Sequence, residues 1–163
     1  VALPTLIYGL SLSYVSPLLG IEGVNFGSSL ILNICAEFVL GVDPQSSDLN
    51  INLHPIAFAG WIGMLVTALN LIPIGQLDGG HIVFALSPKQ HKWTGRLFFL
   101  ALFPLGYFWT GWFFWAVMIV LVGFKTAPLL DDTEELGTLH RVLGLVSISI
   151  FLVTFIPIPF SLL

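Results

Sequence analysis

The residues of this chain best suited to chemistry lie between positions 70 and 80, inside its longest apolar segment. Asp78 carries an ionisable carboxylate, and Asn70 carries an amide with one acceptor and two donors. An ionisable group within a bilayer-spanning segment costs roughly 2.5 to 3.5 kcal/mol on insertion scales, so its presence indicates a function by default. Such a carboxylate could ligate a metal, bind a coupling ion or proton, or hydrogen-bond a helix end.

The same stretch predicts a broken helix. Pro73 cannot continue a helix, and Gly75, Gly79 and Gly80 permit backbone angles that other residues avoid. Broken backbone at membrane depth is tolerated only where it packs against protein or lines a wet cavity. We therefore expect the elements around residues 70–80 to hold the carboxylate and the amide in place.

The composition indicates an integral membrane protein. Of the 163 residues, 56% are hydrophobic and 9% are charged, which is unlike a water-soluble globule. The prediction is an all-α, polytopic transmembrane helical bundle in one membrane domain, residues 1–163, with membrane lipids as partners. Five basic residues form no run and the net charge is -4, which excludes nucleic acid as a partner. The lone Cys35 excludes an internal disulfide and a Cys-based zinc site.

Hydropathy and helix-breaking residues divide the chain into membrane segments. The expected segments are residues 3–20, 26–42, 54–86 with a break at 70–80, 97–106, 111–124 and 141–157. The first two could cross the membrane or fold back as a re-entrant hairpin. The second is expected to begin at the cap-like cluster Gly27-Ser28-Ser29 and to end at Gly41, before Asp43-Pro44. Residues 87–93 are expected to form a polar turn, and His54 is expected to cap a helix or to lie at the membrane interface.

A second set of residues predicts packing and orientation. Gly60, Gly63, Thr67 and Ala68 form a small-residue face suited to close contact with another helix. The basic residues fall in the loops 87–96 and 125–141, whereas the polar loop 43–52 has none. The positive-inside rule then makes the basic loops cytoplasmic.

The sequence of residues 70–80 resembles a motif of a known protein family. It reads Asn70-x-x-Pro73-x-x-x-Leu77-Asp78-Gly79-Gly80 at the end of an apolar helix. This is similar to the second signature of the site-2 proteases, zinc metalloproteases that cut peptide bonds within the bilayer. The preceding residues 54–63 and an acidic turn near residues 130–135 look like the branch found in cyanobacteria, chloroplasts and archaea.

The resemblance implies a zinc site and a membrane-embedded peptide or protein substrate. It makes Asp78 the third zinc ligand and Asn70 a catalytic residue that positions the substrate or the oxyanion, with Pro73 and Gly75 shaping the substrate-binding loop. Catalytic zinc takes three protein ligands and a water whose pKa it lowers toward 7, and that water would attack the peptide bond. An amide donor would stabilise the developing charge.

One part of the family pattern is missing. The other two ligands and the general base belong to a His-Glu-x-x-His helix, and this sequence contains no such motif. We expect an N-terminal part that precedes Val1 in a longer protein to supply this motif. This chain alone would then be inactive. The alternatives are a non-catalytic relative that binds membrane segments, and a transporter-like protein that uses Asp78 as an ion or proton site. His81, three residues after Asp78, could hold a metal weakly, but packing or hydrogen bonding suits it better.

Overall fold

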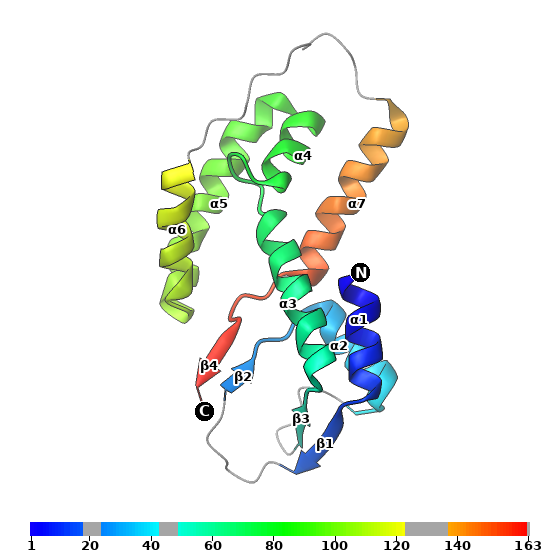
Figure 1. Cartoon of the computed structure of the whole chain (residues 1–163). Coiled ribbons are helices and arrows are strands. Elements are labelled where there is room, and N and C mark those ends of the chain that lie inside the picture. The colour runs from blue at the N-terminus through cyan, green and yellow to red at the C-terminus, as the bar shows by residue number, and fades with distance from the viewer. Residues whose placement is uncertain (18–23, 43–48, 123–136, 163) are drawn as a thin grey trace. The chain divides into compact units, whose positions relative to one another are not determined.

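The computed structural model describes residues 1–17, 24–42, 49–122 and 137–162, and these are mostly helical, as predicted (Figure 1). The helices are α1 (Ala2–Ser11), α2 (Leu30–Leu40), α3 (Pro55–Asn70), α4 (Asp78–Leu86), α5 (Pro88–Phe108), α6 (Gly111–Val122) and α7 (Thr138–Thr154). Within these described ranges, no helix combines the length and the apolar character needed to cross a membrane. The acidic turn expected near residues 130–135 lies outside the described residues, as does most of the polar loop 43–52.

The part of the chain that the structure describes also contains four short strands, which the sequence did not predict. Strand β1 (Tyr14–Pro17) pairs with β3 (Leu49–Asn52), and β2 (Val24–Phe26) pairs with β4 (Phe160–Leu162), both antiparallel. The expected helix over residues 3–20 is therefore shorter, since α1 ends at Ser11 and β1 follows it. Each pair joins segments that are distant in sequence, so no local sequence pattern predicts the pairing.

The chain divides into two compact units, Val1–Ala68 with Val153–Leu163, and Leu69–Leu152. In the first unit, Gly60 and Gly63 of the small-residue face of α3 pack closely on α1, whereas Thr67 is exposed. A Cβ on Gly60 would come within 2.6 Å of the Leu6 Cα, and one on Gly63 within 2.9 Å of the Ala2 Cβ. Trp61 is fully buried beside them, and its Nε1 donates to the Gly27 carbonyl at 2.8 Å.

The boundaries of α2 follow the sequence signals. Ser29 is its N-cap, and the Ser29 hydroxyl accepts a hydrogen bond from the Leu32 amide at 3.3 Å. Gly41 ends the helix with φ +67°, in the left-handed region that glycine enters at little cost.

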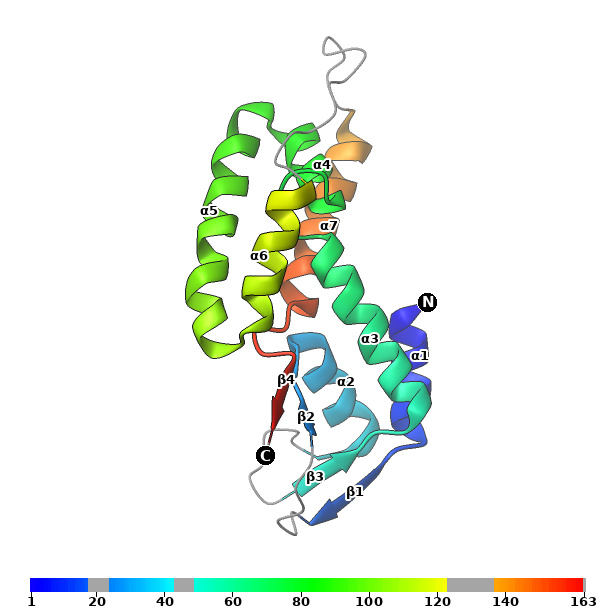
Figure 2. The ribbon, with the colours of Figure 1, turned by 60° about the vertical axis from the view of Figure 1, so that its left-hand side comes forward.

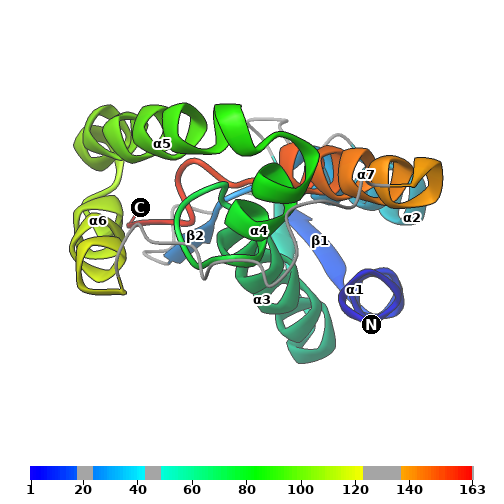
Figure 3. The ribbon, with the colours of Figure 1, turned by 90° about the horizontal axis from the view of Figure 1, so that it is seen from above.

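The second unit contains α4, α5, α6 and α7 as far as Leu152, with α4 and α6 both packed beside α5 (Figures 2 and 3). The prediction of a polar turn over residues 87–93 was wrong, because α5 begins at Pro88. A proline at the first helical position costs no hydrogen bond, since the first amides of a helix have no partner within it. The helix continues through Pro104 to Phe108, and the expected joint before α6 falls at residues 109–110.

Candidate functional site

The break expected at residues 70–80 is an ordered loop. Helix α3 ends at Asn70 and α4 begins at Asp78, and residues 71–77 between them are not helical. Backbone hydrogen bonds hold the loop: Ile72 N donates to the carbonyl of Leu69 in α3 at 3.3 Å, and Leu77 N donates to the Ile74 carbonyl at 3.1 Å. We call residues 71–77 the motif loop.

One side of the motif loop is buried. Ile72 and Ile74 are 2% and 1% exposed, and Pro73 and Gly75 are buried between and beside them. Gly75 has φ +54°, a conformation in which a side chain would be strained. Pro73 and Gly75 therefore lie where they can shape the loop, and their predicted part in substrate binding stays a prediction.

The first turn of α4 lies directly on the motif loop. A Cβ on Gly79 would overlap the Leu71 carbonyl, and one on Gly80 would overlap the Gly75 carbonyl oxygen. Gly95 of α5 also faces the motif loop, and a Cβ on Gly95 would lie 3.6 Å from the Pro73 carbonyl oxygen. Glycines 79 and 80 are thus required by backbone packing, which fixes the direction in which α4 starts.

The polar side chains of the stretch lie on its exposed side. Asn70 is the last residue of α3 and Asp78 is the first of α4, and both are exposed, as are Gln76 and His81. A carboxylate in the first turn of a helix is favoured by the positive end of the helix dipole. The two residues singled out for chemistry therefore flank one short loop, and both side chains are exposed.

The donor set available to a metal is small. Within the described ranges, no group of three or more His, Cys, Asp or Glu side chains lies close enough together to hold a metal ion. Catalytic zinc needs three protein ligands, so Asp78 and its described neighbours do not by themselves fit a zinc site. Asp78 has the chemistry of one ligand only.

The histidines divide into structural and exposed groups. His54 caps α3, because its Nδ1 accepts from the Ile56 amide at 3.3 Å, as expected. His81 and His140 are exposed. His91 had been assigned to a polar turn, but it lies in α5 and is 5% exposed. No spacing signal in the sequence distinguishes His91, since a tertiary contact buries it.

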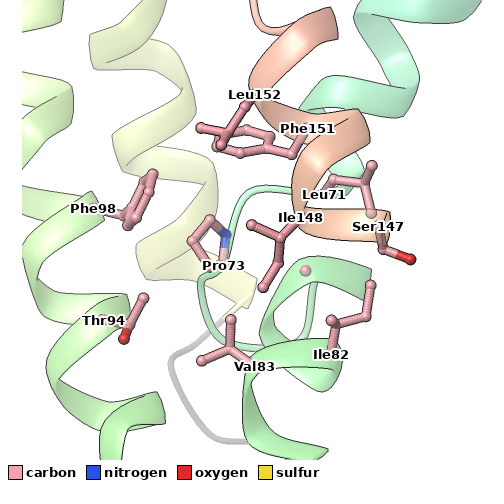
Figure 4. Close-up of a pocket in the computed structure, with 11 residues that line it drawn as sticks. Leu71, Pro73, Ile82, Val83, Thr94, Phe98, Ser147, Ile148, Phe151 and Leu152 are labelled. Atoms are coloured by element: carbon pink, nitrogen blue, oxygen red, sulfur yellow. The ribbon is translucent and has the colours of Figure 1, made fainter. Parts of the chain in front are cut away.

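The buried side of the site contains an apolar cavity of about 130 Å³ (Figure 4). Pro73 of the motif loop, Val83 of α4, Phe98 of α5 and Phe151 of α7 point into it. The rings of Phe98 and Phe151 meet edge to face with centroids 5.9 Å apart. The Ser147 hydroxyl at its rim donates to the Leu143 carbonyl at 2.9 Å, so it offers no free donor to the cavity.

Comparisons with known proteins place this site in a family. The model of "Peptidase family M50" matches residues 21–110, which include the motif loop and both flanking helices. The chain is 28% identical to the probable zinc metalloprotease EGY1, chloroplastic, of Arabidopsis thaliana, over 86% of this chain and 26% of that protein. It is 30% identical to the probable zinc metalloprotease EGY2, chloroplastic, of Oryza sativa subsp. indica, over 93% of this chain and 30% of that protein.

A shorter match covers 40% of this chain and 4% of the DDT domain-containing protein PTM of Arabidopsis thaliana, at 35% identity. No solved structure matches the chain significantly.

The chain spans less than a third of the length of the two protease relatives. The family match covers more than half of the chain and confirms the resemblance first seen in the motif. The chain belongs to peptidase family M50, the site-2 protease family.

Proposed function

We propose that this chain is part of an intramembrane zinc metalloprotease that hydrolyses peptide bonds of membrane-embedded substrates. In this proposal Asp78 is the third zinc ligand. The two histidine ligands and the general base come from a segment outside residues 1–163, because these residues contain no His-Glu-x-x-His motif. The family and the names of the two protease relatives support the class of reaction and the metal.

The observation that carries the proposal is the separation of the two sides of the stretch. Its apolar residues and glycines are buried in backbone packing, whereas Asn70 and Asp78 are exposed. The helix dipole favours a carboxylate at the start of α4, but the packing of the loop does not require one. A ligand on a rigid support is what a metal site needs, because a loosely held ligand loses affinity.

Asn70 would act on the substrate and not on the metal. Asn70 is the last residue of α3, and the motif loop separates it from Asp78. An amide donor near the attacked carbonyl stabilises charge that develops there, which is worth about 3 kcal/mol in well-aligned sites. Pro73 and Gly75 would hold the distance between the two side chains.

The membrane setting is also part of the proposal. Large apolar side chains are exposed along α6, among them Phe114, Val117 and Leu121, and also along α7. Such surfaces suit contact with lipid or with the transmembrane segment of a substrate. Lys89, Lys92 and Arg96 in the first half of α5 would then face the cytoplasm.

The test is the zinc content and cleavage activity of the full-length protein that carries this chain. We expect Asp78→Ala to lose bound zinc and all cleavage, because two ligands do not retain catalytic zinc. Asn70→Ala should keep its zinc and cleave about 100-fold more slowly. Glu37→Ala is the matched control, since it removes an exposed carboxylate of α2 and should change neither property.

Two outcomes would contradict the proposal. If Asp78→Ala retains zinc and activity, Asp78 is not a ligand. If the unmodified protein itself binds no zinc, the chain belongs to a non-catalytic relative or uses Asp78 for another ion, and ion-dependent flux in liposomes would then identify the latter.

A further inference from the structure

His91 is a buried polar side chain of α5 that contacts α4. It lies in the first turn of α5 and is 5% exposed, and its backbone amide donates to the Ser87 carbonyl at 3.1 Å. A buried imidazole loses its contacts with water, so it needs hydrogen bonds from the protein. Neither the family signature nor the zinc proposal assigns His91 a part.

The contacts of His91 are with α4. Its ring donates a hydrogen bond to the Gly80 carbonyl. The same ring meets the Phe84 ring edge to face, with centroids 5.4 Å apart. In an α-helix the carbonyl of residue 80 is also the acceptor for the amide of residue 84, so His91 binds α4 at both ends of one helical turn.

Gly80 is therefore held from two directions. On one side its Cα lies on the motif loop, where a Cβ would come 3.0 Å from the Ile74 carbonyl oxygen. On the other, its carbonyl accepts from the His91 ring. Because Gly80 is two residues from Asp78, whatever fixes the peptide at Gly80 also fixes the first turn of α4, from which the Asp78 carboxylate projects.

We infer that His91 is a positioning residue for Asp78, acting through the Gly80 carbonyl. The inference rests on the proposed role of Asp78 as a zinc ligand. Outer residues that orient a ligand typically change metal affinity or activity 10- to 100-fold when they are removed. His91 acts through a backbone carbonyl, so we expect an effect of about tenfold, at the lower end of that range.

The test compares three variants of the full-length protein by the rate at which a chelator removes zinc. His91→Phe keeps an aromatic ring against Phe84 but has no donor, and it should lose zinc about tenfold faster. His91→Gln keeps an N–H that reaches the Gly80 carbonyl, and it should restore zinc retention to within about threefold of the unmodified protein. His91→Leu is a second donor-free variant in case the Phe variant does not fold.

Cleavage kinetics add a readout that simple loss of packing would not give. With zinc saturating, the donor-free variant should show a lower kcat and an unchanged KM, because the carboxylate is displaced and the substrate-binding surface is not. The inference is overturned if the donor-free variants release zinc as slowly as the unmodified protein, or if Gln performs no better than Phe. If neither donor-free variant folds, the Gln variant decides alone, and rapid zinc loss from it is also a refutation.

Asp78→Ala is measured in parallel to keep the two proposals apart. If that variant retains zinc, the proposed function has failed, whatever His91 does. If it loses zinc while His91→Phe retains it, only the positioning role of His91 has failed.

Discussion

Replacing Gly79 with alanine should destabilise the fold strongly, and the structure gives the reason. The new Cβ would overlap the Leu71 carbonyl and lie 2.7 Å from the Ile72 carbonyl oxygen. Both obstacles are backbone atoms of the motif loop, so no change of rotamer can relieve them. Overpacking of this kind typically costs about 1 to 3 kcal/mol, and a backbone obstacle puts Gly79→Ala at the upper end, near 3 kcal/mol of unfolding free energy.

Gly95→Ala is the matched control, and it should change stability in the opposite direction. Gly95 also faces the motif loop, but the atom nearest to its added Cβ is the Pro73 carbonyl oxygen at 3.6 Å, an ordinary contact. Glycine inside a helix is less stable than alanine by about 1 kcal/mol, and Gly95 lies inside α5. The same Gly-to-Ala change should therefore stabilise the protein at residue 95 and destabilise it at residue 79.

Thermal unfolding of the detergent-purified protein measures both effects. A change of 1 kcal/mol shifts Tm by about 2 to 4 °C in a chain of this size, so Gly79→Ala should lower Tm by about 6 to 12 °C. Gly95→Ala should raise it by about 2 to 4 °C. Equal melting temperatures for Gly79→Ala and the unmodified protein, or equal losses in both variants, would refute the account of the glycines as points of backbone contact.

Three further predictions concern other parts of the chain. Burial lowers the pKa of His91 from its usual 6.5, so the unfolded chain binds a proton more readily than the folded one. The contribution of His91 to the free energy of unfolding should thus be complete above about pH 6.5 and should be lost as the pH falls through the folded-state pKa. Thermal melts should show this pH dependence in the unmodified protein, and His91→Gln should lack it. Ser29→Ala removes the N-cap of α2 and should cost about 1 kcal/mol in a denaturant titration, whereas Ser28→Ala, next to it and exposed, should cost nothing measurable. Val83→Ile adds one methylene to the apolar cavity and should raise the free energy of unfolding by up to about 0.8 kcal/mol; a loss of stability would show that the cavity cannot take a larger side chain.

The sequence predicted the parts of the fold that are determined locally. The break between α3 and α4 could be predicted from Pro73 and Gly75, which disfavour a continuous helix, although Gly79 and Gly80, expected in the break, lie in the first turn of α4. The limits of α2 could be predicted from the cluster Gly27-Ser28-Ser29, which contains the N-cap, and from Gly41, because capping depends on residues next to the helix end. The polar pair, Asn70 and Asp78, stands out in the sequence, because polar groups are rare in so apolar a chain.

The features that were not predicted depend on partners far along the chain. Strands β1 and β3 pair residue 14 with residue 52, and neither four-residue segment has a pattern that requires pairing. Residues 87–93 contain two lysines and predict a polar turn, although Pro88 begins a helix. His91 looked like part of that solvated turn, and only its contact with Phe84 and Gly80 of α4 shows that it is buried.

The spacing of the family motif follows from packing as much as from chemistry. Gly79 and Gly80 must meet the carbonyls of Leu71 and Gly75, so the number of residues between them is fixed by the path of the motif loop. One additional residue between Asp78 and Gly79, inside α4, would rotate the Asp78 side chain by about 100° relative to the two glycines, since an α-helix has 3.6 residues per turn. With the glycines held on the motif loop, that rotation would turn the Asp78 carboxylate from its exposed position. The residues that could bind zinc or substrate thus owe their geometry to neighbours that do neither, and a search for the site by its polar residues alone would miss what holds them in place.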